Sequence, residues 1–395
     1  MPDGPRVALC VPRYGAGIVG GAETLARLMA QNLVAHGTHL EVLTTCAVDH
    51  FTWADAHPEG ATVEDGVTVR RFAVSRDRDA DRFWQCHGGI ATDAPMSYAD
   101  ELEWMANSVW SPGLQDALED DTRYDWVVAI PYLFGTTFWA AAGRTNRTAL
   151  IPCVHDESHA WTRVVRSALA AVGGCMLNSI GEGQLLHRLA PTARTQLVGV
   201  GYEEEPVPTT AEVQAFCAAR GIEPGYLLYA GRRESAKGLP LLFESYAQLR
   251  RDMPHAPPLA LMGSGELPVP DDIAPHVIEL GYVPTPDRAA AYASASVLAH
   301  PSELESLGMV MLEAWLAGTP AVVNSRSPVL LQHCQASGGG LWFADPPTFS
   351  VAVQQILDDQ SLRTSLATGG REYVLSTFSW PEVRKRFLGA LERWA

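Results

Sequence analysis

A basic loop bounded by glycines is the part of the sequence best suited to bind phosphate. Residues 231–238 read GRRESAKG, between an expected strand and an expected helix. A planar guanidinium at Arg232 and a mobile ammonium at Lys237 suit two neighbouring phosphates. The chain has 27 arginines but only two lysines, so a lysine in this loop indicates a position that a guanidinium does not serve. The alternative is an exposed basic turn.

Two glutamates bracket the expected start of a helix near Gly308. Glu305 precedes this start and Glu313 lies more than a turn inside the helix. Ser306 is expected to cap the helix, and the free N–H groups of residues 307–309 suit an anion. Carboxylates accept hydrogen bonds from vicinal hydroxyls, such as those of ribose or a hexose. The alternative is two surface glutamates, one of them interacting with the helix dipole.

Three other motifs are weaker. Residues 15–20 read GAGIVG, but residues 12–14 separate them from the strand and no acid follows the next strand, which favours a flexible glycine turn over a dehydrogenase. Two D-x-D triplets at 77–81 alternate with arginines, which favours a solvated, self-paired loop over a metal site. His155 and His159 have a zinc-like spacing without an established helix, so a single functional His155 is favoured. We therefore expect no metal site.

These residues need parallel strands to bring them together. Short apolar runs alternate with helical segments, which is typical of parallel sheets covered on both faces. The first expected strands are Val7–Val11, Leu40–Thr44, Val67–Phe72, Trp126–Pro131, Ala149–Val154 and Cys175–Asn178. After an acidic, proline-broken stretch, a second series comprises Tyr226–Ala230, Leu259–Met262, Val277–Leu280, Val297–Ala299, Ala321–Val323 and Leu341–Phe343. We expect two α/β domains joined near residue 203, with ligands bound in a cleft between them.

Composition excludes several classes of partner. The net charge of −16 divides evenly, with −8 on residues 1–200 and −8 on the rest, so neither half has the excess of basic residues that a nucleic acid requires. Because of the same negative charge, we do not expect peripheral contact with an anionic membrane. No apolar run reaches the ~20 residues of a membrane span. Seven scattered cysteines without a C-x-x-C motif indicate a reducing cytoplasm. A monomer or homodimer is expected.

The motifs together resemble those of family 4 glycosyltransferases of the GT-B fold. Arg232 and Lys237 in GR-x4-KG, followed by Glu305-x7-Glu313, carry the resemblance most specifically. It extends over nearly the whole chain through GGAE at 20–23, GSG at 263–265, GYV at 281–283 and FSW at 378–380. Two positions depart from the family pattern: Leu307, where the family usually has Phe, and Arg233, where an apolar residue is common.

The resemblance implies two Rossmann-like domains that face a central cleft, with a C-terminal helix crossing back to the first domain. Residues 1–203, with the helix at 379–395, would bind the acceptor, and residues 204–378 would bind a nucleotide-sugar donor. The implied catalytic residues are Arg232, Lys237, His155 and Glu305. The implied donor-binding residues are Gly21, Gly231, Gly263, Val283, Leu307, Gly308, Met309 and Glu313.

Within that set, the resemblance assigns the diphosphate to Arg232 and Lys237, the ribose to Glu313, the transferred sugar to Glu305 and the sugar's reactive face to His155. The implied activity is retaining, metal-independent hexosyl transfer without a cofactor. Alternatives are a sugar phosphorylase or nucleotide-sugar epimerase of the same fold, and a non-catalytic sugar-nucleotide binding module.

The acceptor is the least determined ligand. It is expected on the first domain, whose loops at 13–20, 47–60 and 73–115 are weakly patterned. The candidate contacts are Arg13, Tyr14, Trp53 and Trp84, although most tryptophans in a chain of this size complete cores. A small soluble acceptor, as in natural-product or thiol biosynthesis, or a saccharide is expected.

Overall fold

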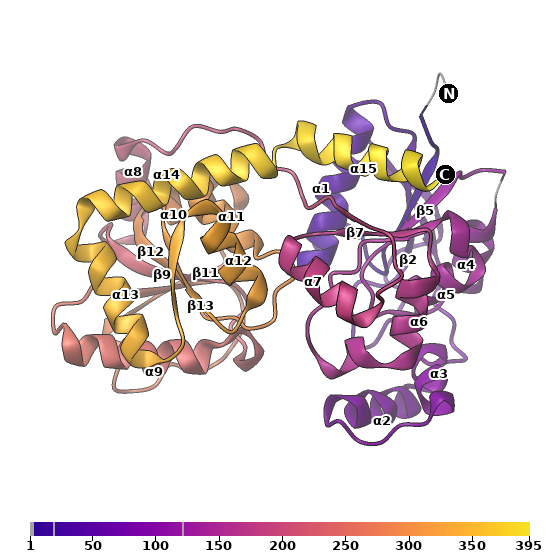
Figure 1. Ribbon diagram of the computed structural model, residues 1–395, viewed down its shortest axis with the longest axis horizontal. Coiled ribbons are helices and arrows are strands. Elements are labelled where there is room, and N and C mark those ends of the chain that lie inside the picture. The colour runs from indigo at the N-terminus through magenta and orange to yellow at the C-terminus, as the bar shows by residue number, and fades with distance from the viewer. Residues whose placement is uncertain (1–3, 19, 121) are drawn as a thin grey trace. The chain divides into compact units, whose positions relative to one another are not determined.

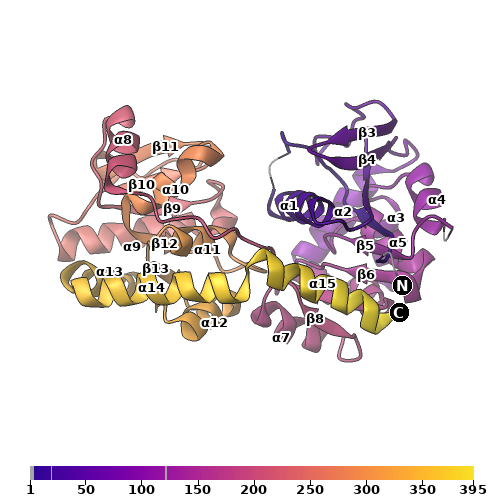
Figure 2. The same cartoon turned by 90° about the horizontal axis from the view of Figure 1, so that it is seen from above.

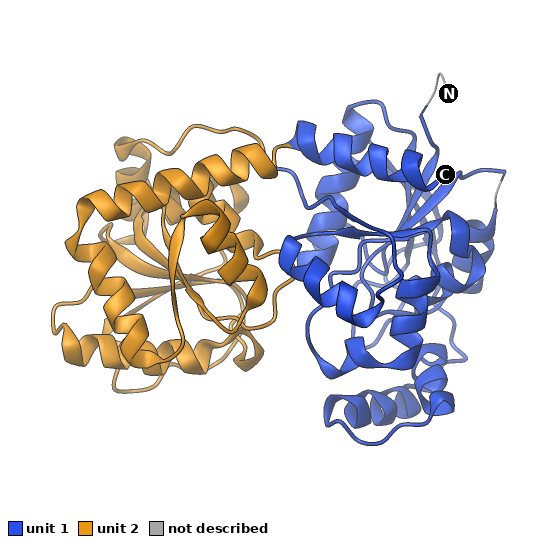
Figure 3. Ribbon diagram, viewed as in Figure 1, with its two compact units in different colours: residues 1–201, 380–395 blue, residues 202–379 orange. Residues whose placement is uncertain are grey.

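Short apolar runs that alternate with helices form two separate sheets in the computed structural model, which describes residues 4–18, 20–120 and 122–395. Each sheet belongs to its own compact unit (Figure 3). Unit 1 comprises residues 1–201 with 380–395, and unit 2 comprises residues 202–379. The predicted α/β fold with two largely parallel, Rossmann-like sheets is confirmed.

The sheet of unit 1 has eight strands in the order β3-β4-β2-β1-β5-β6-β7-β8. Its strands are β1 (Val7–Cys10), β2 (Leu40–Thr45), β3 (Gly60–Glu64), β4 (Val67–Phe72), β5 (Trp126–Ala129), β6 (Thr148–Leu150), β7 (Gly174–Leu177) and β8 (Thr195–Leu197). All neighbouring strands pair in parallel except β3, which pairs antiparallel with β4 at one edge. Strands β1, β5, β6 and β7 are buried along their whole length, as expected for a sheet covered on both faces.

Helices from distant parts of the sequence surround this sheet (Figures 1 and 2). They are α1 (Gly21–Ala35), α2 (Ala80–Ala91), α3 (Tyr98–Ala106), α4 (Pro112–Glu119), α5 (Gly135–Gly143), α6 (Arg163–Ala171), α7 (Ile180–Leu189) and α15 (Trp380–Trp394). The last of these, α15, confirms the predicted return of the C-terminal helix to the first domain. Arg384 donates to Asn32 Oδ1 at 2.7 Å and Arg386 to the Val198 carbonyl at 3.0 Å.

Unit 2 contains a six-stranded, fully parallel sheet in the order β11-β10-β9-β12-β13-β14. Its strands are β9 (Tyr226–Ala230), β10 (Leu259–Met262), β11 (Val277–Gly281), β12 (Ala295–His300), β13 (Ala321–Asn324) and β14 (Gly340–Phe343). Its helices are α8 (Thr210–Arg220), α9 (Leu239–Asp252), α10 (Thr285–Ala293), α11 (Met309–Leu316), α12 (Pro328–Ser337), α13 (Pro346–Asp358) and α14 (Gln360–Thr377). Across the described residues, no helix is long and apolar enough to cross a membrane.

Candidate functional site

The predicted donor-side residues lie at one edge of the unit 2 sheet. Gly231 follows β9, Gly263 follows β10, Val283 follows β11 and Glu305 follows β12. These four strands are neighbours in the order β11-β10-β9-β12, and all run parallel. Parallel strands present their carboxyl ends at the same edge, so the loops that carry these residues converge there.

Two glycines allow the loops at this edge to touch. Gly231 N–H donates to the Met262 carbonyl at 2.9 Å, and a Cβ on Gly263 would lie only 2.0 Å from the Gly231 oxygen. Gly238 has φ +77°, and a Cβ there would lie 2.4 Å from the Pro301 oxygen. Any side chain at Gly263 or Gly238 would therefore push backbone segments apart.

Lys237 and Glu305 form an ion pair at this edge. Lys237 ends a short 3-10 helix, Ser235–Lys237, and its Nζ lies 2.8 Å from Glu305 Oε1. Burial raises the pKa of Glu305, but the charges of Lys237 and the nearby His300, with hydrogen bonds from Lys237 and Ser302, together lower it to about 2. The carboxylate is therefore held ionised and the ammonium is held in place.

The two arginines of the basic loop differ in surroundings. Arg232 is about half exposed, with side-chain exposure of 52%, and contacts Glu234 at 3.1 Å, so its guanidinium is accessible to a ligand. Arg233, the departure from the family pattern, bonds to Glu279 at 2.6 Å and to the Leu267 carbonyl at 2.9 Å. Arg233 therefore fastens the basic loop to the neighbouring loop and strand.

The helix start predicted near Gly308 is present, but the predicted cap is wrong. The residue that precedes α11 is Gly308 itself, in a left-handed conformation (φ +78°), and no side chain caps the helix. Ser306 lies two positions too early to reach the first turn. Among the described residues, the N–H groups of Leu307, Gly308 and Met309 find no backbone acceptor, so they remain available to an anion.

Glu313 projects from α11 into a polar cluster that the sequence did not indicate. Arg288 Nη2 and the Tyr292 hydroxyl, both on α10, donate to Glu313 Oε2 at 2.7 and 2.8 Å. Burial raises the pKa of Glu313, while the charge and hydrogen bond of Arg288 and the hydrogen bond of Tyr292 oppose this effect. The only available signal was the helical spacing of Arg288 and Tyr292, which places them on one face of α10.

The predicted residues of unit 1 lie after β1 and β6. Gly21 is the exposed first residue of α1, where a Cβ would meet nothing within 4 Å. His155 follows β6, and its Nδ1 lies 3.5 Å from Glu157 Oε1, which also accepts from the Tyr132 hydroxyl at 2.6 Å. Although burial raises the pKa of Glu157, these two partners lower it overall. Glu157 was not singled out from the sequence.

The four candidate acceptor contacts differ in exposure. Arg13, Tyr14 and Trp53 are buried: Arg13 pairs with Glu23, and Trp53 packs edge-on against Phe134. Trp84, on α2, is 44% exposed. Of the four, Trp84 therefore offers the most accessible ring, and the acceptor roles of all four stay predictions. Val19, inside the glycine motif at 15–20, lies outside the described residues.

The acidic loop at 77–81 is built differently from the expectation. Asp79 caps α2 by accepting from the Arg82 N–H at 2.9 Å. The Arg82 guanidinium pairs with Asp100 and Glu103 of α3, so the expectation that these arginines neutralise their own loop is wrong for Arg82. Over the described ranges, no three His, Cys, Asp or Glu side chains gather in a group that could hold a metal ion.

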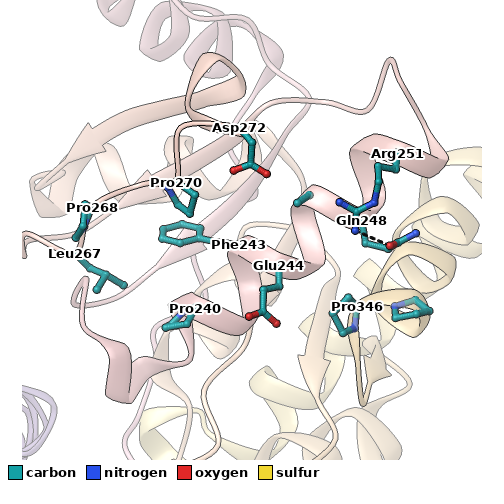
Figure 4. A pocket seen from close by; sticks show the side chains of 12 residues that line it. Pro240, Phe243, Glu244, Gln248, Arg251, Leu267, Pro268, Pro270, Asp272 and Pro346 are labelled. Carbon is teal, nitrogen blue, oxygen red and sulfur yellow. Dashed lines mark hydrogen bonds between the residues drawn. The ribbon is translucent and has the colours of Figure 1, made fainter.

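A separate cavity of about 720 Å³ lies along α9 (Figure 4). Five prolines form much of its wall, with Phe243, Glu244 and Arg251 among the other lining residues. The prolines are Pro240, Pro268, Pro270, Pro346 and Pro347. None of the predicted site residues is among the described residues that line this cavity, so it is distinct from the polar site at the sheet edge.

Several known proteins resemble this chain in sequence or in fold. A model of the family "Glycosyl transferases group 1" matches residues 224–359. D-inositol 3-phosphate glycosyltransferase 1 of Catenulispora acidiphila is 30% identical over 410 residues, which cover 95% of this chain and 91% of that relative. The Jonesia denitrificans D-inositol 3-phosphate glycosyltransferase is 28% identical, over 98% of this chain and 96% of the relative. The structure of Anabaena Alr3699/HepE in complex with UDP-glucose has a TM-score of 0.70 at 14% identity, covering 98% of this chain and 100% of that one, which shows a shared GT-B fold.

Proposed function

Because the chain belongs to the group 1 glycosyltransferases (family 4), retaining enzymes that use nucleotide-diphosphate sugars, we propose that it transfers a hexose from a uridine-diphosphate sugar to a small polyhydroxylated acceptor. The observation that carries the donor part is the Lys237–Glu305 ion pair at the carboxyl edge of the unit 2 sheet, just before α11, the helix that carries Glu313. A solved structure of the same fold holds UDP-glucose, which supports uridine as the base.

The donor would lie along this edge in a fixed direction. Arg232, Lys237 and the N–H groups of Leu307–Met309 would bind the diphosphate, because all of them are cationic or are hydrogen-bond donors without an internal acceptor. Glu313 would accept from the ribose hydroxyls and Glu305 from the transferred sugar. Gly231, Gly263 and Val283 would form the floor, where the glycines permit close approach of the backbone.

The reaction would proceed on one face of the sugar. The bond from the anomeric carbon to the phosphate oxygen breaks, and the bond to the acceptor oxygen forms on the same face. The acceptor's proton passes to the departing phosphate oxygen, so the products are a nucleoside diphosphate and a glycoside of retained configuration. Lys237 and Arg232 would stabilise the negative charge that grows on the diphosphate.

Unit 1 would bind the acceptor through the loops after β1, β2 and β6 and through α2. The named activity of the two full-length relatives concerns a cyclitol phosphate, which favours a cyclitol or a sugar as the acceptor class. The exposed ring of Trp84 could stack on such a ring, and His155 would contact the transferred hexose.

The test is an assay with UDP-, GDP-, dTDP- and ADP-glucose against cyclitols, cyclitol phosphates and mono- and disaccharides. We expect release of UDP that depends on acceptor and a product whose anomeric proton shows retained configuration by NMR. Epimerised donor without acceptor, or sugar phosphate formed only with inorganic phosphate, would establish the epimerase or phosphorylase alternative. Tight donor binding without turnover or hydrolysis would establish a binding module.

A further inference from the structure

Two side chains of α10 hold Glu313 from the same direction. Arg288 and Tyr292 are four positions apart on this helix and therefore share a face. Both donate to Oε2 of Glu313, at 2.7 and 2.8 Å. In the part of the chain that the structure describes, neither bond uses Oε1, so this oxygen is left to accept from a ligand. Glu313 thus has one oxygen for the protein and one for a partner.

Because Glu313 is largely enclosed by protein, its ionised form would be unfavourable without a nearby cation. The side chain of Glu313 is 20% exposed and Tyr292 is 1% exposed, whereas Arg288 is 35% exposed and reaches inward from the rim. The buried Tyr202 hydroxyl also faces this carboxylate, but it is neutral and has no hydrogen-bond partner among the described residues. Arg288 therefore supplies the positive charge that favours the ionised carboxylate, against the burial that raises the pKa of Glu313 overall.

We propose that Arg288 is the positioning residue of the nucleotide site, which holds Oε2 of Glu313 and so leaves Oε1 directed at the ribose hydroxyls. The proposal rests on the function proposed above, which assigns Glu313 to the ribose. Without Arg288, Glu313 takes up a proton or turns toward water, and recognition of the hydroxyls is lost. The phosphate contacts at Lys237 do not depend on Arg288 and persist.

A purely structural role is the competing explanation, because the same ion pair joins α10 to α11. If Arg288 has only a structural role, its removal weakens the binding of every ligand equally, because the whole site becomes less ordered. If Arg288 instead positions Glu313, its removal weakens the binding of only those ligands that carry the ribose hydroxyl that Glu313 contacts. Ligand pairs that differ by one ribose hydroxyl therefore separate the two roles.

The experiment measures, by calorimetry, the Kd of UDP, GDP and ADP, each beside its 2′-deoxy form. The proteins are wild type, Arg288→Met, Arg288→Lys and Glu313→Gln. The matched control is Arg220→Met, which removes another ion pair of α10, between Arg220 and Asp287 at 2.9 Å. Thermal unfolding of each variant reports whether it is folded.

We expect wild-type protein and Arg220→Met to prefer UDP over 2′-deoxy-UDP by about ten-fold or more, the value of a hydrogen bond to a charged acceptor. In Arg288→Met and Glu313→Gln the preference falls to within about three-fold, and Arg288→Lys restores part of it because it retains the charge. The acid limb of the wild-type binding profile should also move to higher pH in Arg288→Met.

An undiminished preference in a folded Arg288→Met overturns the proposal, as does equal weakening of both ligands of a pair. Wild-type protein that binds UDP without preferring the ribose form overturns the ribose role of Glu313 and with it this inference, while transferase activity can still be present. If none of the three pairs binds, the proposed function and the inference fall together.

Discussion

At the scale of the residue, the two lysines of the chain provide an internal comparison. Lys237 is paired with the half-buried Glu305, whereas Lys385 lies on α15 with 77% of its side chain exposed and a distant contact, 3.9 Å, to Glu382. The same residue type thus occupies one site of proposed chemistry and one solvated surface. Its two locations allow a test in which composition changes equally.

Lys237→Ala should lower kcat by about 100-fold, as expected for the loss of one preorganised charge at the departing group. The variant also leaves the half-buried Glu305 without its cation, so the pKa of that carboxyl should rise. Steady-state turnover with the donor found by the screen measures the effect, and Lys385→Ala is the control with unchanged turnover. Near-wild-type turnover of Lys237→Ala would remove this lysine from the reaction.

Removal of divalent metal ions is a second test of whether protein groups alone stabilise the departing diphosphate. If cationic side chains and helix N–H groups carry the charge of the diphosphate, EDTA should leave the initial rate unchanged. Asp79, the middle acid of the 77–81 loop, is already engaged as the cap of α2. A rate abolished by EDTA and restored by Mg²⁺ or Mn²⁺ would show that a divalent cation bridges the phosphates instead.

At the scale of the element, the glycine between the 3-10 helix and α9 fixes the geometry of the basic loop. Gly238→Ala should lower both stability and kcat, since its methyl group would meet the Pro301 carbonyl. The control is Gly221→Ala at the end of α8, which has a similar left-handed backbone (φ +63°) but open space around it. The control should lose only about 1 kcal/mol of unfolding free energy, the cost of the left-handed conformation, with turnover intact. Equal losses in the two variants would contradict the steric explanation.

Elements whose burial is continuous were predictable from the sequence, and exposed or local ones were not. Strands Tyr226–Ala230 and Leu259–Met262 match their predictions residue for residue, because continuous burial requires apolar runs. Strand Val67–Phe72 also matches, although its buried and half-buried positions alternate. The edge strand β3 is almost wholly exposed and therefore carries no apolar signal. The helices α2 and α3 lie within the weakly patterned stretch at residues 73–115, and α4 begins in it.

The candidate site divides in the same way. Residues in a recognisable spacing, such as Lys237 and Glu305, could be singled out because their chemistry is tied to a local motif. Arg288 and Tyr292 could not, because their role depends on how α10 packs beside α11. The failed cap at Ser306 reflects a glycine whose left-handed conformation starts the helix without a side-chain acceptor.

At the scale of the whole molecule, buried and half-buried histidines make stability depend on pH. Burial lowers the pKa of His87 in unit 1, and of His300 and His333 in unit 2, to about 4. Unfolded histidines titrate near 6.5, so between about pH 4 and 6.5 the unfolded chain binds more protons. The stability that these histidines contribute is therefore complete above that window and declines as the pH falls through it. Glu182, whose burial raises its pKa to about 8, acts in the opposite sense.

Because Glu182 opposes the histidines, the test compares the acid-induced loss of stability between variants and does not use the pH dependence of wild type alone. When the pH is lowered from neutral to about 5 at constant temperature, wild type should lose about 2 kcal/mol more unfolding free energy than His333→Gln does. Denaturant unfolding at both pH values measures the difference. His36→Gln, at the exposed end of α1, should behave as wild type. An identical acid loss in His333→Gln would refute the contribution of this imidazole.

The return of α15 to unit 1 has a consequence for the order of folding during synthesis. Gly174 and Gly201 pack against Trp394 and Trp380, so closely that a Cβ on either glycine would overlap the ring. Both rings belong to a helix that is translated after all of unit 2. Unit 2 can therefore complete its sheet on the ribosome while unit 1, although begun earlier, still lacks helix α15. The half of the protein that is made first is the half that finishes last.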